Sequence, residues 1–162
     1  MKTIYLSLGS NRGDRARNLR AALAALEHGG IVVRRVSSFY ETAPLGVAGQ
    51  PLFLNLAVEA ASALLPRQLL SRTLRIEREL GRRRAVAQSP RTIDIGILFY
   101  GSSVIRTPEL AVPHPRLAAR RFVLQPLAEI AAGLRHPLTK RTVRQMLARL
   151  APQKTRKVHP AA

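Results

Sequence analysis

Residues 89–101 read SPRTIDIGILFYG, and this stretch predicts a buried strand that carries one carboxylate. Its isoleucines and Phe99 supply the β-branched and aromatic bulk that strands favour, Pro90 marks the entry, and Gly101 begins a tight exit turn. An unpaired buried carboxylate is strongly unfavourable unless it takes up a proton. Asp94 is therefore either a structural acid held by an arginine or a backbone amide, or a metal ligand that faces arginines around a polyphosphate.

The size and composition of the chain predict one globular domain. Its 162 residues fit a single core, and the 46% of hydrophobic residues suffice to fill it. We expect this domain over residues 1–152 and a basic C-terminal tail over residues 153–162. The absence of cysteine excludes a disulfide framework and a thiolate nucleophile. No apolar run is long enough to span a bilayer, and the first residues lead straight into a strand-like run, so we expect a cytoplasmic protein without a membrane partner.

The formal net charge of +18, from 27 basic and 9 acidic residues, predicts an anionic partner. Nucleic acid is not the partner that we expect, because only 4% of the residues are aromatic and single-strand binders stack bases on exposed rings. Arg82–Arg84 and Arg91 crowd the segment just before the strand that carries Asp94, so an anion site and a solvated surface are equally good interpretations of these arginines. We interpret the basic residues between 140 and 157 as a solvated face and a loose tail.

The segments before the central stretch alternate between strand and helix patterns. Alternation of apolar with polar residues predicts strands at residues 4–8, 31–36 and 53–59. We expect Asp14 to cap a helix that stops at Gly29-Gly30, and Pro66 to start a second helix that ends at Gly81. The order strand, helix, strand, strand, helix, strand is a split βαβ pattern. It predicts an antiparallel-rich α+β sandwich with helices on one face.

The remaining segments are predicted loops and two short C-terminal helices. Residues 37–51 form a long loop, a feature that is often functional in a compact domain. Residues 81–90 combine weak periodicity with high positive charge, and we interpret them as a mobile loop. Helical spacing returns at residues 123–132 and 143–150, which we expect to be added to the sandwich.

Two further features have both a structural and a functional interpretation. Phe53 and Asn55 share one face of their strand, so the ring is either part of the core or a surface for a flat heterocycle that Asn55 also binds. His114 lies between two prolines that restrict its backbone. It is either incidental or, close to arginines, a ligand for phosphate.

Five motifs, in order along nearly the whole chain, resemble the signatures of the 6-hydroxymethyl-7,8-dihydropterin pyrophosphokinase family. They are Gly9-Ser10-Asn11, SFYETAPLG at 38–46, Phe53-Leu54-Asn55, PRTIDI at 90–95 and Val112-Pro113-His114. The resemblance implies a ferredoxin-like fold, which agrees with the split βαβ pattern. It also implies magnesium-dependent transfer of pyrophosphate from ATP to the hydroxymethyl group of the pterin, with release of AMP, in folate biosynthesis. We expect a monomer.

The same resemblance implies roles for individual residues. The catalytic residues would be Arg82, Arg91 and Asp94, with Asp94 as the magnesium ligand. The pterin would contact Thr42, Ala43, Pro44, Leu45, Phe53, Asn55 and Phe122. ATP would contact Leu70, Glu77, Arg84, Arg91, Ile97, His114 and Arg120. The arginine loop would close over both substrates and exclude water.

Two positions depart from the family pattern. Gly96 stands where the family has a second aspartate, on the same side of the strand as Asp94, and Gln88 stands where an aromatic residue is common. These departures and the basic charge leave three hypotheses for the function. The first is an active pyrophosphokinase whose magnesium coordination is completed by water, the second a pterin- or nucleotide-binding protein with little transfer activity, and the third a basic nucleic-acid-binding module.

Overall fold

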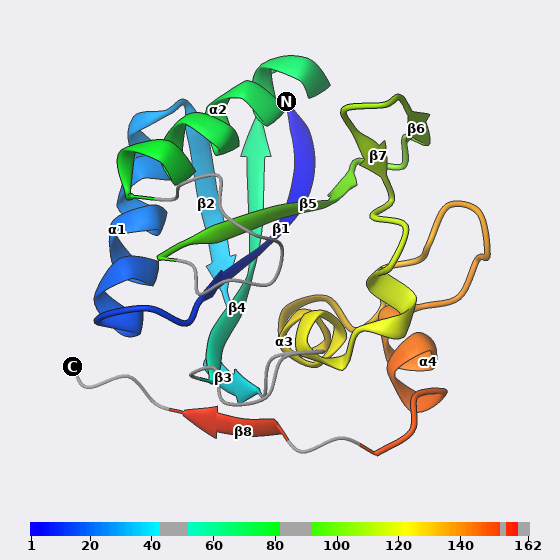
Figure 1. Cartoon of the computed structure of the whole chain (residues 1–162). Coiled ribbons are helices and arrows are strands. Elements are labelled where there is room, and N and C mark those ends of the chain that lie inside the picture. The colour runs from blue at the N-terminus through cyan, green and yellow to red at the C-terminus, as the bar shows by residue number, and fades with distance from the viewer. Residues whose placement is uncertain (43–51, 82–91, 153–154, 159–162) are drawn as a thin grey trace.

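A computed structural model describes residues 1–42, 52–81, 92–152 and 155–158 (Figure 1). Its main sheet has six strands: β1 (Lys2–Ser10), β2 (Ile31–Val36), β3 (Phe39–Thr42), β4 (Phe53–Ser62), β5 (Asp94–Tyr100) and β8 (Thr155–Val158). The order is β5-β1-β4-β3-β8, and β2 pairs with the C-terminal half of β4. All of these pairs are antiparallel. Strands β6 (Ile105–Arg106) and β7 (Ala111–Val112) form a separate small hairpin.

Helices cover both faces of the sheet (Figure 1). Helices α1 (Arg15–His28) and α2 (Pro66–Glu79) lie on one face, and α3 (Arg121–Ala131) and α4 (Val143–Ala148) lie on the other, after the short 3-10 helix η1 (Leu117–Ala119). The two helices of the split βαβ pattern share one face, as expected, and the added C-terminal helices cover the other face. The C-terminal helices carry enough apolar residues to bury a second sheet face.

Alternation along the strands produces two cores. Ile4, Leu6 and Leu8 of β1 are fully buried against α1 and α2, together with Leu54 and Leu56 of β4. The opposite face packs Ala57, Phe99 and residues of α3 and α4 into a second cluster. Because successive side chains of a strand point to opposite faces, one strand serves both cores.

The predicted helix boundaries are confirmed by their caps. The Asp14 carboxylate accepts a hydrogen bond from the Arg17 N–H at 3.1 Å, and the Gly29 N–H donates to the carbonyls of Ala25 and Leu26. Pro66 is the first residue of α2. The N–H at this position has no hydrogen-bond partner within a helix, so proline fits there although it lacks one.

Two strands lie where the sequence predicts none. Strand β3 occupies four residues of the expected loop 37–51, and β8 occupies four residues of the expected loose tail. The two strands pair with each other, so each gives the other its backbone partners. The tail is not loose over Thr155–Val158. The division into a domain of residues 1–152 and a tail stays a prediction.

Within the described residues, no helix combines the length and the apolar character that crossing a membrane requires.

Candidate active site

A row of residues crosses the sheet at Gly9. This glycine is paired with Asp94 of β5 on one side and with Asn55 of β4 on the other. Directly opposed residues of antiparallel strands project from the same face. That face is the one covered by α3, because Ala57, which shares a face of β4 with Asn55, packs against α3. Asp94 and Asn55 therefore lie on one face of the sheet.

Gly9 allows Phe53 and Asn55 to lie directly over the backbone of β1. A Cβ atom at position 9 would lie 2.6 Å from Asn55 Oδ1 and 3.6 Å from Cδ1 of the Phe53 ring. The buried Asn55 amide is fixed by Nδ2, which donates a hydrogen bond to Thr42 Oγ1 at 2.9 Å. This arrangement offers a flat aromatic surface beside an oriented amide, the two features that hold a planar heterocycle.

Phe122 and Arg120 come from the start of α3. The Arg120 guanidinium carbon lies 5.4 Å from the centroid of the half-buried Phe122 ring, a cation–π contact. The charge of Asp94 acts on Arg120 as well. Arg120 thus contacts the aromatic ring of α3 and is near enough to Asp94 of β5 to interact with its charge.

His114 is held beside β5 by its backbone and by its ring. Its N–H donates to the Leu98 carbonyl at 2.9 Å, and its Nδ1 accepts from the Arg116 N–H at 3.1 Å. Burial lowers the pKa of His114, Arg120 and Arg116 lower it further, and Asp94 opposes them. The ring is therefore neutral at pH 7 and carries its proton on Nε2, which can donate to a phosphate oxygen.

The residues predicted for ATP fall into two groups. His114 and Arg120 lie close enough to Asp94 for its charge to raise the pKa of each. Ile97 belongs to the core on the α1–α2 face, with Leu70 packed against that core. Glu77 is 2% exposed, and its carboxylate accepts a hydrogen bond from the Ile95 N–H at 2.7 Å. The structure thus brings His114 and Arg120 to Asp94, and leaves the other group on the opposite face of the edge strand β5.

Asp94 fits a magnesium ion that arrives with phosphates. The sequence predicts a buried Asp94, but in the structure this residue is half-buried, because it is the first residue of β5. Within the described residues no group of three or more His, Cys, Asp or Glu side chains could hold a metal. Magnesium is commonly bound through one or two carboxylates together with substrate phosphates, and this mode needs no such cage.

Position 96 lies on the same side of β5 as Asp94 and is paired with Ser7. A Cβ atom there would lie 3.2 Å from Ser7 Oγ, which is a close contact with a hydroxyl that can turn.

Several of the predicted site residues fall in parts of the chain that the structure does not describe. They are Ala43, Pro44, Leu45, Arg82, Arg84 and Arg91, together with Gln88.

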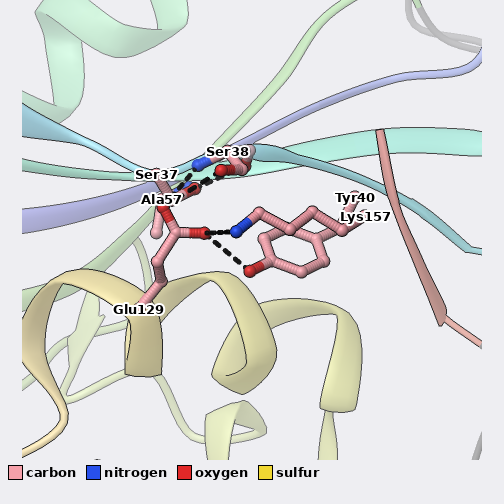
Figure 2. A network of polar contacts seen from close by, with 6 residues as sticks. All are labelled: Ser37, Ser38, Tyr40, Ala57, Glu129 and Lys157. Atoms are coloured by element: carbon pink, nitrogen blue, oxygen red, sulfur yellow. Dashed lines mark hydrogen bonds and ion pairs between the residues drawn. The ribbon is translucent and has the colours of Figure 1, made fainter. Parts of the chain in front are cut away.

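The structure also reveals polar residues around the site that the sequence did not single out. Glu129 of α3 accepts hydrogen bonds from the Ser38 N–H at 2.8 Å and from the Tyr40 hydroxyl at 2.6 Å (Figure 2). Arg15 forms an ion pair with Glu41 at 2.8 Å. The residues of each of these pairs lie far apart in the sequence, so no local sequence pattern predicts the contacts. Gly9 did carry a signal, since a glycine in a strand often marks a close approach to the backbone.

Comparison with known proteins places the chain in a family. Residues 5–132 match the family described as 7,8-dihydro-6-hydroxymethylpterin-pyrophosphokinase (HPPK). The chain is 47% identical over 152 residues to the 2-amino-4-hydroxy-6-hydroxymethyldihydropteridine pyrophosphokinase of Bacillus subtilis (strain 168), covering 93% of this chain and 91% of that one. It is 40% identical over 145 residues to the enzyme of the same name from Aquifex aeolicus (strain VF5), covering 90% of each chain.

Solved structures support the fold. The crystal structure of Plasmodium falciparum HPPK-DHPS wild type with pteroate superposes with a TM-score of 0.74 at 15% identity, over 91% of this chain and 42% of that one. The α+β, ferredoxin-like fold is confirmed, and these relatives do not favour a binding protein without transfer activity or a nucleic-acid-binding module. The chain belongs to the 7,8-dihydro-6-hydroxymethylpterin-pyrophosphokinase family and is a pyrophosphokinase of folate biosynthesis.

Proposed function

We propose that this chain transfers pyrophosphate from ATP to 6-hydroxymethyl-7,8-dihydropterin on the α3 face of its sheet, over the row Asp94–Gly9–Asn55. The observation that carries the proposal is the pairing of Gly9 with both other residues. It sets the carboxylate and the amide two strands apart, about 10 Å by ordinary strand spacing. Gly9 adds no side chain, so the Asn55 amide and the Phe53 ring can lie over β1 and offer a substrate a surface between the two ends of the row.

The pterin binds at the Asn55 end of this row. Phe53 of β4 and Phe122 of α3 supply aromatic surface on the same side of the sheet, and Asn55, held by Thr42, binds the hydrogen-bonding edge of the heterocycle. Ala43, Pro44 and Leu45 complete this part of the site. A buried amide that already has one fixed partner loses little conformational entropy when it binds a ligand.

ATP binds at the Asp94 end. ATP therefore crosses the edge strand β5. His114 and Arg120 donate to phosphate oxygens on the α3 face, joined by Arg84, and Leu70, Glu77 and Ile97 lie around the nucleoside from the other face. Arg82 and Arg91 stabilise the charge that develops as the hydroxymethyl oxygen attacks the β-phosphorus in line with the departing AMP. Asp94 holds magnesium, which neutralises phosphate charge when it is bound.

The experiment that tests this proposal measures AMP release while each substrate is varied. Asn55→Ala raises KM for the pterin, and Arg120→Gln raises KM for ATP, each by about tenfold, the effect of losing one charge-assisted or buried hydrogen bond. The control is Glu109→Gln on an exposed loop. If the two variants do not separate the two KM values, the proposed division of the site is wrong.

The proposal includes a monomer located in the cytoplasm. Sedimentation equilibrium tests the monomer, and localisation of the tagged protein in its own cell tests the compartment.

A further inference from the structure

We propose that the C-terminal strand β8 positions the pterin end of the active site, with Arg156 and Lys157 as its positioning residues. This inference rests on the proposed placement of the pterin at Thr42, Asn55 and Phe122. None of the positioning contacts lies in the reacting row itself.

Strand β8 lies directly beside the strand that ends in Thr42 (Figure 1). Thr42 is paired with Thr155 of β8 on one side and with Phe53 of β4 on the other. Strand β3 is four residues long. The position of Thr42 therefore depends on the strands that pair with β3. With β8 removed, β3 would become a short edge strand next to the substrate.

The two basic residues of β8 reach opposite faces of the sheet, because successive side chains of a strand alternate. Arg156 Nη2 lies 3.1 Å from Glu41 Oε1. Lys157 Nζ lies 3.8 Å from Glu129 Oε1, on the face where α3 packs (Figure 2). Strand β8 is therefore held on one face through β3 itself and on the other through α3.

Glu41 joins β8 to both chain segments that lead into the pterin residues. Arg15 contacts Glu41 through Nη2 at 2.8 Å and donates from Nη1 to the Leu52 carbonyl at 2.9 Å. Glu41 immediately precedes Thr42, and Leu52 immediately precedes Phe53. Arg15, Glu41 and Arg156 together fix the end of β3 relative to the start of β4.

Glu129 joins β8 to the helix that carries Phe122. The same carboxylate accepts hydrogen bonds from Tyr40 and from the Ser38 N–H at the start of β3 (Figure 2). At the other end of α3, Arg121 Nη2 donates to the carbonyls of Leu150 and Ala151 at 3.3 Å. The chain that leads to β8 is thus attached at both ends of α3, and it ties α3 to β3.

These contacts set local geometry more than they set global stability. Arg156 and Lys157 are exposed, and exposed ion pairs contribute little to the free energy of unfolding. Neither residue belongs to the two cores. Of the described residues of β8, only Val158 packs against a core, and it is only partly buried, so loss of β8 loosens an edge of the sheet and leaves its centre folded.

The test compares full-length variants by substrate kinetics and thermal unfolding. The double variant Arg156→Pro/Lys157→Pro removes both side chains and two consecutive N–H donors, one of which faces β3 in an antiparallel pair. A second variant, Arg156→Gln/Lys157→Gln, keeps the backbone donors. We expect KM for the pterin to rise about five- to tenfold in the proline variant and less in the glutamine variant. KM for ATP and Tm stay close to wild type.

Two controls accompany this test. Arg34→Gln/Arg144→Gln removes two exposed cations elsewhere, and Arg156→Lys/Lys157→Arg keeps both charges. Neither changes KM for the pterin. An unchanged pterin KM in both β8 variants, or a parallel rise of both KM values with a large fall in Tm, overturns the inference. Asn55→Ala is measured alongside. If it raises KM for the pterin while the β8 variants do not, only the role of β8 is wrong; if it has no effect, the proposed pterin site is wrong as well.

Discussion

Asn55 and Asp94 lie on the same face of the sheet, two strands apart, with only the backbone of Gly9 between them. The amide is locked by Thr42, and the carboxylate acts electrostatically on His114 and Arg120. The residues that we propose bind the heterocycle and those that we propose bind the phosphates therefore share one surface, with the Asn55 amide lying over the strand between them. Pyrophosphate transfer needs this kind of surface, because both substrates must be aligned before the oxygen attacks.

Gly9→Ala tests the close approach at the centre of this surface. The new Cβ atom would lie 2.6 Å from Asn55 Oδ1, so the amide must move and its hydrogen bond to Thr42 breaks. We expect KM for the pterin to rise about tenfold, which corresponds to the loss of one well-placed hydrogen bond. Gly133→Ala is the matched control, since a Cβ atom there meets nothing within 4 Å. Equal kinetics for the two variants would contradict the placement of the pterin.

His114 titrates below its ordinary pKa of 6.5 in the folded protein, because burial and the charges of Arg120 and Arg116 disfavour the imidazolium form. Asp94 favours that form, so Asp94→Asn lowers the pKa of His114 further and Arg120→Gln raises it. Proton NMR of the His114 ring over a pH series, without magnesium, measures all three midpoints. A midpoint at or above 6.5 in the wild type, or no shift in Asp94→Asn, would argue against the proximity of these groups.

Much of the fold could be predicted from the sequence, because its signals are local. Asp14, Gly29 and Pro66 mark helix ends through contacts within a few residues, and alternation identifies β1 and β4. Strands β3 and β8 could not be predicted in this way. Their residues, FYET and TRKV, are largely polar, and they form strands because they pair with each other across more than a hundred residues of sequence.

The sequence identifies candidate residues for the site but not how they are arranged in space. The sequence marks Asp94 as an unusual acid in a strand, but its half-burial follows from its place as the first residue of β5. The role of Glu129 depends on α3 packing against β3, which no spacing in the sequence encodes.

Glu41 and Glu129 hold β8 in place through ion pairs, so the attachment of β8 depends on pH. The hydrogen bond from Arg15 lowers the pKa of Glu41, and the charges of Arg15 and Arg156 add to this effect against desolvation. Desolvation raises the pKa of Glu129, but hydrogen bonds from Tyr40 and Ser38 outweigh it. Both pKa values lie below the ordinary 4.5, so the stabilisation is complete above pH 4.5 and is lost as the pH falls through the folded-state values.

Hydrogen exchange measures this loss directly. We expect backbone amides of β3 and β8 to lose protection below pH 4.5 while amides of β1 keep theirs, after correction for the intrinsic pH dependence of exchange. Glu41→Gln should show the weakened β8 protection already at neutral pH. Simultaneous loss in all three strands would mean that β8 is not separately anchored.

Replacement of Glu77 should lower the free energy of unfolding. Its carboxylate satisfies the Ile95 N–H on β5, the edge strand of the sheet, and Glu77→Ala leaves that buried donor without this partner. The free energy of unfolding should fall by about 1–3 kcal/mol, the range for an unsatisfied buried group. Denaturant titration measures it against Glu79→Ala, an exposed position on the same helix. Equal stability of the two variants would show that Glu77 has no structural role.

Gly96→Asp tests whether the missing side chain beside Asp94 limits the use of magnesium. The new Cβ atom lies 3.2 Å from Ser7 Oγ, which can turn away, and the carboxylate projects to the same side of β5 as Asp94. We expect the magnesium concentration for half-maximal AMP release to fall. Gly96→Asn, which has the same size and no charge, is the control, and a similar fall in that variant would exclude an added ligand.

The most direct measurement of the central claim is AMP release by Asp94→Asn over a full range of magnesium concentrations, with ATP and 6-hydroxymethyl-7,8-dihydropterin both saturating. If Asp94 holds magnesium as proposed, loss of its carboxylate removes several kcal/mol of charge stabilisation, so kcat should fall about 100-fold or more at every magnesium concentration, with Tm unchanged. A variant that releases AMP at close to the wild-type rate would show that the reaction does not depend on Asp94.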